Sequence, residues 1–132
     1  MLGEISRIMD IGCGVDIIEI DRIREDIESI GDRFLRRVFT DREIEYCESK
    51  KTQKFQHYAG RFAAKEAAFK AISKLLDDKY SICWKDFEVV NDEQGRPKLN
   101  FQNVATDKFK SVDISISHCR LYAVANVTVL YK

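Results

Sequence analysis

The chain has little of what marks a secreted, membrane or zinc-binding protein. Its four cysteines are dispersed and form no C-x-x-C pair, so a zinc ribbon or a thioredoxin-type redox centre has no support. Only two histidines are present, which leaves few nitrogen ligands for zinc. The longest apolar runs are far too short to span a membrane, and residues 1–10 lack the pattern of a signal peptide. We therefore expect reduced thiols, no membrane partner and a cytoplasmic location.

Features that divide a chain into parts are also scarce. There is one proline, and there is no Gly/Ser-rich linker, no repeat and no low-complexity tract, so residues 1–132 are expected to form a single domain. A chain of 132 residues that is 45% hydrophobic can bury one core without disulfides. Basic and acidic side chains number 22 each, so the overall charge favours no nucleic-acid partner.

The hydrophobic pattern mixes strands and helices without regular βαβ alternation, which predicts an α+β fold. A β-branched run predicts a strand over 11–20, and the strongest helical periodicity covers 53–76. Thr40, with Glu43 three residues later, predicts a capping box at the start of a helix over 40–49. The other expected elements are helices over 21–30, 33–38 and 104–110, a hairpin of strands over 87–90 and 97–101, and a final strand pair over 112–117 and 121–130.

Glu66 is the unusual residue of the long predicted helix. On a helical wheel it falls between Phe62 and Phe69 on an apolar stripe, where an ionised carboxylate is costly unless a cation or hydrogen-bond donors compensate it. Lys70 follows one turn later. The two charges form either an ordinary helical Glu–Lys pair or part of a buried functional site. The full stripe comprises Phe55, Tyr58, Phe62, Phe69 and Leu76.

Two other groups of side chains on this helix have alternative interpretations. Arg61, Lys65 and Lys70 form a cluster able to bind phosphate, although a solvated charged face is the commoner outcome. Small residues on the opposite face predict close packing against a sheet or a neighbouring subunit, or they reflect only the helix propensity of alanine. These small residues are Gly60, Ala63, Ala64, Ala67, Ala68 and Ala71.

Asp16 is an acid among aliphatic residues. Strand alternation places it on the same face as Gly14 and Ile18, and Gly14 would leave room for a ligand to approach the backbone. A simpler alternative is that Asp16 ends the strand and caps a helix, but aliphatic residues continue after it. Two carboxylates in apolar surroundings can share a divalent cation, and Mg²⁺ suits one or two carboxylates together with substrate phosphates. We therefore expect Asp16 and Glu66 to hold Mg²⁺.

Five segments resemble, in the same order, the holo-(acyl-carrier-protein) synthases, a family of 4′-phosphopantetheinyl transferases. They are GVDIIEIDRI, GDRFLRRVFTDRE, GRFAAKEAAFKA, NDEQGRP and SISHCRLYAVA. The resemblance implies transfer of 4′-phosphopantetheine from coenzyme A to a serine of acyl carrier protein, with release of adenosine 3′,5′-bisphosphate, in fatty acid biosynthesis. It also implies an antiparallel sheet packed on a long helix, and a homotrimer with sites between subunits.

The resemblance implies roles for individual residues as well. Asp16 and Glu66 would bind the metal and, with Lys70, carry catalysis. The residues implied in binding coenzyme A are Arg61, Lys70, Pro97, Ser117 and His118. Those implied in docking the carrier protein are Arg22, Arg33, Phe34 and Arg37. Where the family often has Phe-Gly-Thr-Gly, this chain has ISKLLDDKYSICW, so the long helix is expected to continue for about another turn.

Other functions remain open from the residues alone. An arginine-rich module could dock on acidic proteins or RNA without chemistry, although the chain lacks an aromatic–basic RNA-binding pattern. The same arginines could also be a solvated helix face balanced by nearby acids. A purely structural oligomer explains the alanine face but not the two acids. The acceptor of the serine proton is open between Glu66 and a metal-bound water.

Overall fold

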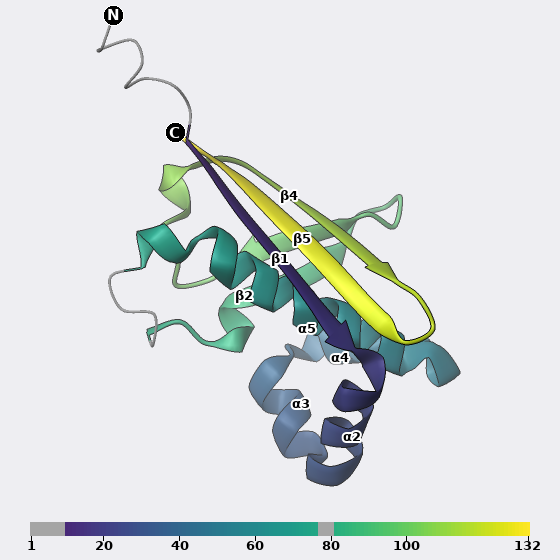
Figure 1. Ribbon diagram of the computed structural model, residues 1–132. Helices are drawn as coiled ribbons and strands as arrows, with labels where there is room; N and C mark the ends of the chain where they lie inside the picture. The colour runs from purple at the N-terminus through teal and green to yellow at the C-terminus, as the bar shows by residue number, and fades with distance from the viewer. Residues whose placement is uncertain (1–9, 77–80) are drawn as a thin grey trace, which may run out of the picture.

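A three-stranded antiparallel sheet and one long helix form the centre of the molecule. The computed structural model describes residues 10–76 and 81–132, so the prediction for the first ten residues lies almost wholly outside the described part. The sheet has the order β1-β5-β4, from β1 (Ile11–Glu19), β5 (Tyr122–Tyr131) and β4 (Phe109–His118). Helix α5 (Lys54–Ala71) lies behind these strands (Figure 1). The predicted α+β fold, with an antiparallel sheet on a long helix, is confirmed.

The sheet and α5 approach closely because both present small residues at their contact. A Cβ atom added to Gly14 would lie 1.9 Å from the carbonyl oxygen of Ala67, and one added to Gly12 would lie 2.1 Å from that of Ala71. The predicted packing of the alanine face against a sheet is therefore confirmed. The idea that Gly14 leaves room for a ligand is wrong, because the helix backbone fills that space.

The remaining elements extend the centre at two places. Helices α2 (Ile20–Ile30), α3 (Asp32–Val38) and α4 (Asp41–Glu48) gather at one end of the sheet (Figure 1). Strands β2 (Phe87–Asn91) and β3 (Pro97–Phe101) form the predicted hairpin. The 3₁₀ helices that join these elements within the described ranges include η1 (Lys51–Gln53), η2 (Ser73–Leu75), η4 (Trp84–Asp86) and η5 (Thr106–Lys108).

Two local predictions have different outcomes. The capping box at α4 is confirmed: the Thr40 hydroxyl accepts from the Glu43 N–H, and the Glu43 carboxylate accepts from the Thr40 N–H at 2.9 Å. The helix predicted over 104–110 is wrong, because only one 3₁₀ turn precedes β4. Phe109 already belongs to that strand, since its ring packs edge-on against Phe101 and Tyr131 in the core.

The predicted extension of the long helix to Leu76 is also wrong, because α5 ends at Ala71. Two side chains take over the carbonyl groups at its end: the Ser73 hydroxyl donates to the Lys70 carbonyl at 2.9 Å, and the Tyr131 hydroxyl donates to the Ala71 carbonyl at 2.8 Å. Such side-chain bonds compete with continued helix. Among the described residues, no helix has both the length and the apolar character needed to cross a membrane.

Candidate functional site

A groove of about 760 Å³ opens where β1, α2, α3 and α5 meet. Strand β1 brings Asp16 to this groove, and α5 brings Glu66 and Lys70 from two successive turns. The three residues predicted to carry catalysis therefore share one cavity. Asp16 reaches it because its side chain points to the α5 side of the sheet, beyond the point where Gly12 and Gly14 contact the helix.

Lys70 connects the helix to the strand across this groove. Its ammonium donates to the Asp16 carboxylate at 3.3 Å and to the Val15 carbonyl at 3.0 Å. The Lys70 side chain is 51% exposed, whereas that of Asp16 is 20% exposed. The ion pair of Lys70 is thus formed with the strand acid, and the helical pair with Glu66 that the sequence left open is not the contact observed among the described residues.

The Glu66 carboxyl group lies in an environment that disfavours its charge. Burial raises its pKa, the negative charge of Asp16 raises that pKa further, and Lys70 partly opposes both effects. Asp16 and Glu66 are therefore near enough to repel each other, and a divalent cation between them would relieve this repulsion.

These two carboxylates suit Mg²⁺ better than a metal that is fully enclosed by protein. The described residues contain no cluster of three or more histidine, cysteine, aspartate or glutamate side chains able to hold a metal. Mg²⁺ commonly takes one or two carboxylates and fills its other positions with water and substrate phosphates. Asp16 and Glu66 in an open groove match that requirement, so the residues present fit the predicted ion.

Three of the four residues predicted to dock the carrier protein line the same groove. Arg22 comes from α2, and Phe34 and Arg37 come from α3. Arg33 does not line the groove and is exposed on α3. The structure therefore places positive charge and one aromatic ring directly beside the carboxylate pair.

Trp84 completes an aromatic wall that the sequence did not predict. Its ring stacks on Phe62, with centroids 4.8 Å apart and an interplanar angle of 29°, and both rings line the groove. A second cavity of about 230 Å³ adjoins Trp84 and Glu66 and is lined mainly by apolar side chains, including Phe69. No sequence period pointed to Trp84, because it lies in a single 3₁₀ turn that directly precedes β2.

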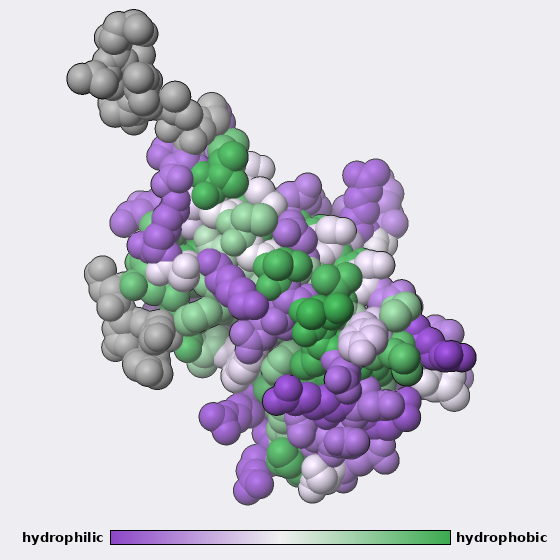
Figure 2. All heavy atoms as spheres, viewed as in Figure 1, coloured by the Kyte–Doolittle hydropathy of each residue, from purple (hydrophilic) through white to green (hydrophobic). Residues whose placement is uncertain are grey.

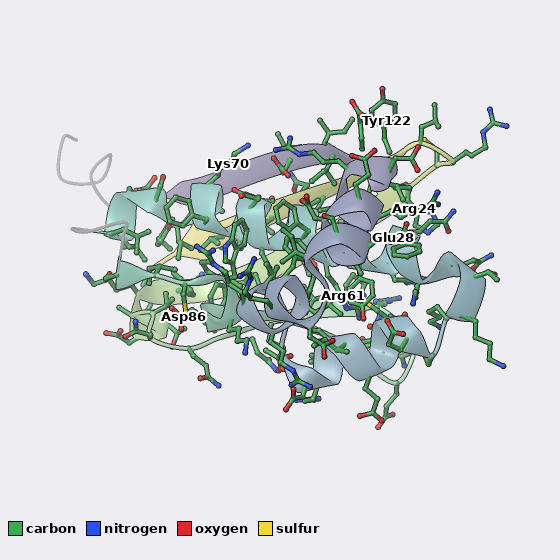
Figure 3. The ribbon with its side chains drawn as sticks, turned by 90° about the horizontal axis from the view of Figure 1, so that it is seen from below. Arg24, Glu28, Arg61, Lys70, Asp86 and Tyr122 are labelled. Atoms are coloured by element: carbon green, nitrogen blue, oxygen red, sulfur yellow. The ribbon has the colours of Figure 1, made fainter. Side chains whose placement is uncertain are left out.

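Arg61, a predicted coenzyme A ligand, lies outside this groove. Its side chain is almost completely buried, donates to the Asn91 amide oxygen at 2.6 Å, and lies over the Tyr46 ring at 3.9 Å from the centroid. Figure 3 shows Lys70 beside β1, whereas Arg61 lies towards α4. The Arg61 Nε atom is buried and has no hydrogen-bond partner among the described residues.

The other predicted coenzyme A residues lie on the Arg61 side. His118 ends β4 and its ring lies 6.0 Å from that of His57 on α5, while Pro97 pairs with Asn91 in the hairpin. Burial, Lys50 and Arg61 lower the pKa of His57 to about 4, so this ring is neutral at pH 7. We call the residues Arg61, Pro97, Ser117 and His118 the distal group. Their neighbours Tyr46, His57 and Asn91 were not predicted from the sequence.

Lys65 is not available to bind phosphate. Its side chain is completely buried, and its ammonium lies 2.7 Å from the Glu43 carboxylate. The prediction that Arg61, Lys65 and Lys70 form one phosphate-binding cluster is therefore wrong. Helical positions 61, 65 and 70 do not share one face, and α4 with the β2 hairpin covers the first two.

The fold and the groove define a class of enzyme. The family described as the 4′-phosphopantetheinyl transferase superfamily matches residues 12–127 of this chain. The chain belongs to this superfamily and is a phosphopantetheinyl transferase.

Within that class, the curated relatives are holo-(acyl-carrier-protein) synthases. The one from Ruminiclostridium cellulolyticum is 41% identical over 126 residues, covering 92% of each chain. The one from Protochlamydia amoebophila is 46% identical over 119 residues, covering 89% of this chain and 95% of the relative. The resemblance predicted from the five segments is confirmed.

Solved structures give the same result. The synthase from Bacillus anthracis, in complex with coenzyme A (3′,5′-ADP), superposes with a TM-score of 0.75 at 35% identity, covering 94% of this chain and 99% of that chain. The synthase from Helicobacter pylori, in complex with coenzyme A, superposes with a TM-score of 0.77 at 28% identity, covering 89% and 98%.

Proposed function

We propose that this transferase moves 4′-phosphopantetheine from coenzyme A to a serine hydroxyl of an apo acyl carrier protein, with Mg²⁺ as its cofactor. The observation that carries the proposal is the convergence of Asp16, Glu66 and Lys70 in one groove. Two close carboxylates and one half-exposed ammonium match a metal-bound diphosphate, which is the reacting part of coenzyme A. The relatives that were solved with coenzyme A support the choice of substrate.

Asp16 and Glu66 would hold the Mg²⁺, which when bound would neutralise charge on the diphosphate oxygens. Lys70 would add a second positive charge at the same diphosphate. Its side chain is half-exposed, and within the described part of the chain its ammonium donates to two acceptors of β1, so it can turn towards a phosphate oxygen at small cost. The remaining residues of the groove orient the reactants around this centre.

The reaction requires one bond to form and one to break. The serine oxygen attacks the phosphorus atom on the pantetheine side, and the bond from that phosphorus to the bridging oxygen breaks. Its electron pair leaves with adenosine 3′,5′-bisphosphate. The serine proton needs an acceptor, and the Glu66 carboxylate and a water in the groove are the two candidates.

The carrier protein would dock over the arginines of α2 and α3. Arg22 and Arg37 line the groove that also holds the carboxylates, and Phe34 offers an apolar contact in the same groove. Arg33 would extend this positive surface outside the groove. Complementary charge of this kind steers an acidic partner and sets its orientation. Roles in fatty acid biosynthesis and in the cytoplasm follow from the proposal.

We also propose that the protein is a homotrimer in which the distal group completes the groove of a neighbouring copy. The groove and the distal group are separate within one chain, although both are expected to bind parts of coenzyme A. The sheet face opposite α5 is apolar along β1, where Ile11, Val15 and Ile17 are 56–64% exposed. Figure 2 shows hydrophobic side chains gathered on this face of the molecule, with polar side chains between them. Burying such exposed apolar residues against other copies would be favourable.

The transferase proposal is tested by mass spectrometry of the carrier protein. Incubation with coenzyme A, Mg²⁺ and an apo acyl carrier protein should add one phosphopantetheine group to the carrier. A carrier whose acceptor serine is replaced by alanine is the matched control and should gain nothing. An unchanged mass of the wild-type carrier under these conditions would overturn the proposal.

The trimer proposal is tested by mixing two inactive variants. Asp16→Ala disables the groove, and His118→Ala disables the distal group. If one active site contains residues of two copies, subunit exchange between these variants should restore part of the activity. Activity that stays at the level of the separate variants, together with a monomeric mass in light scattering, would contradict it.

A further inference from the structure

A buried ion pair lies directly behind the groove, on the opposite side of α5 from Lys70. The side chains of Lys65 and Glu43 are both completely buried, and Lys65 Nζ lies 2.7 Å from Glu43 Oε1. Burial lowers the pKa of Lys65, and Glu43 opposes this effect. Both side chains are thus withdrawn from the solvent.

Every hydrogen of the Lys65 ammonium has an acceptor. Besides Glu43, these acceptors are the carbonyl oxygens of Trp84, at 3.3 Å, and Phe87. They lie at the beginning of η4 and at the residue that follows it. One ammonium thus holds both ends of the short turn that carries Trp84.

The Glu43 carboxylate is equally saturated. Its Oε1 atom also accepts from the Thr40 N–H at 2.9 Å, and its Oε2 atom accepts from the Val89 N–H at 2.8 Å. The pair therefore ties together the start of α4, the middle of α5, η4 and β2. A buried ion pair adds little net stability compared with an apolar pair of similar size. Its geometry, however, fixes the position of the elements around it.

The element that the pair holds forms a wall of the groove. The Trp84 ring stacks on Phe62, and both rings line the groove together with Glu66. Phe62, Lys65 and Glu66 lie within little more than one turn of α5, so the backbone that presents Glu66 also presents the ammonium that fixes the Trp84 turn.

We propose that Lys65 is a positioning residue for phosphopantetheinyl transfer: with Glu43, it fixes the Trp84 turn against Phe62 and so sets the shape of the groove at Glu66. This inference rests on the proposed function. Lys65 does not contact the diphosphate, since its three donors are used inside the protein. Its loss should therefore affect turnover more than the binding of coenzyme A.

Trp84 is the only tryptophan of the chain, so its fluorescence reports on this wall without interference. The main variant is the double substitution Lys65→Met with Glu43→Gln, which leaves no unpaired buried charge, and the amide introduced by Glu43→Gln still offers a carbonyl oxygen to the Thr40 N–H. We expect kcat to fall about tenfold and KM for coenzyme A to change by less than about threefold, because misplacement of groups around a reaction centre acts mainly on turnover. Acrylamide should quench Trp84 more strongly than in the wild type.

The matched control is the exposed ion pair between the same two helices, Lys54 and Glu48, whose side chains are 33% and 46% exposed. The double substitution Lys54→Met with Glu48→Gln should leave kcat and Trp84 quenching unchanged. If the main variant does not give a folded far-UV circular dichroism spectrum, Glu43→Gln alone serves instead. It should shift both readouts in the same direction, by smaller amounts.

Wild-type kcat and wild-type quenching in the folded variant, with only a lower unfolding midpoint, would overturn the inference and leave a structural role. An increased KM for coenzyme A with unchanged Trp84 fluorescence would overturn it in favour of a direct phosphate contact. The fluorescence readout needs no activity. If the wild type itself transfers nothing, the proposed function fails, whereas the link from Lys65 to Trp84 is still tested.

Discussion

Helix α5 carries charges on two faces, and the two faces differ in whether a ligand can reach those charges. On the groove face, Glu66 is disfavoured by burial and by Asp16, and Lys70 is half-exposed. On the covered face, Lys65 is buried and all of its donors are used. A charge that is disfavoured by its surroundings, or that stays accessible in a groove, is one that a ligand can bind. The comparison thus separates ligand-binding charges from positioning ones along a single helix.

The largest effect is expected on the groove face. Asp16→Ala removes one of the two carboxylates proposed to hold the metal, so the rate of transfer should fall about 10³-fold or more. The rate is measured from the mass of the carrier protein at fixed times, and circular dichroism checks the fold. Asp21→Ala, which removes an exposed acid of α2, is the control and should retain activity. A rate near the wild-type value in Asp16→Ala would contradict the proposed metal site.

Breaking the covered pair should affect folding first. Lys65→Met alone leaves the Glu43 charge buried without its partner, which should lower the free energy of unfolding by about 3 kcal/mol. Lys54→Met breaks an exposed ion pair and should change the free energy of unfolding by less than about 1 kcal/mol. Urea denaturation measures both. An equal loss in free energy of unfolding for Lys65→Met and Lys54→Met would contradict the distinction between a buried and an exposed ion pair.

Lys70→Met tests the other charge of the groove. The account predicts a loss of about 10–100-fold in kcat/KM for coenzyme A, because one cation at the diphosphate disappears. The unfolding midpoint should hardly change, since the Lys70 side chain is 51% exposed. A large loss of stability with unchanged kinetics would contradict this role and would show that Lys70, like Lys65, serves mainly to hold the fold together.

Two arginines of α3 sharpen the comparison on the carrier side. Arg37 lines the groove and Arg33 does not, so Arg37→Ala should raise KM for the carrier protein about threefold to tenfold, and Arg33→Ala should raise it less. Both effects should shrink at high salt. Steady-state assays at two salt concentrations give the answer, and a larger effect for Arg33 would place the docking surface outside the groove.

The smallest effect concerns the stability of the protein without metal. Because the folded-state pKa of Glu66 lies above its ordinary value of 4.5, its ionised form costs free energy of folding at neutral pH, and this cost disappears as the pH falls through that range. Glu66→Gln should therefore slightly raise the melting temperature at pH 7, and the gain should vanish near pH 4.5. A gain in melting temperature that is independent of pH would contradict the conclusion that ionised Glu66 destabilises the fold.

The sequence predicted those parts of the fold that depend on local patterns. Alternation placed Asp16 on the same face of its strand as Gly14 and Ile18, and periodicity placed Glu66 between Phe62 and Phe69. The capping box fixed the start of α4. These outcomes need only the period of one element or a motif of four residues.

Other features depend on contacts between distant segments, and the sequence could not show them. The sequence pattern of α5 predicts a surface position for Lys65, but α4 and β2 cover its side chain. The strand pattern likewise leaves Gly14 open, but Ala67 packs against it. The end of α5 depends on the Tyr131 hydroxyl, which lies 60 positions further along the chain than Ala71. The role of Trp84 follows only from its stacking on Phe62.

The most direct test of the central claim is the effect of Mg²⁺ on coenzyme A binding, measured by isothermal titration calorimetry with wild type and Asp16→Ala. If Asp16 and Glu66 hold the metal that contacts the diphosphate, Mg²⁺ should tighten binding to the wild type about tenfold or more and should have no effect on the variant. Equal tightening in both proteins would contradict the account.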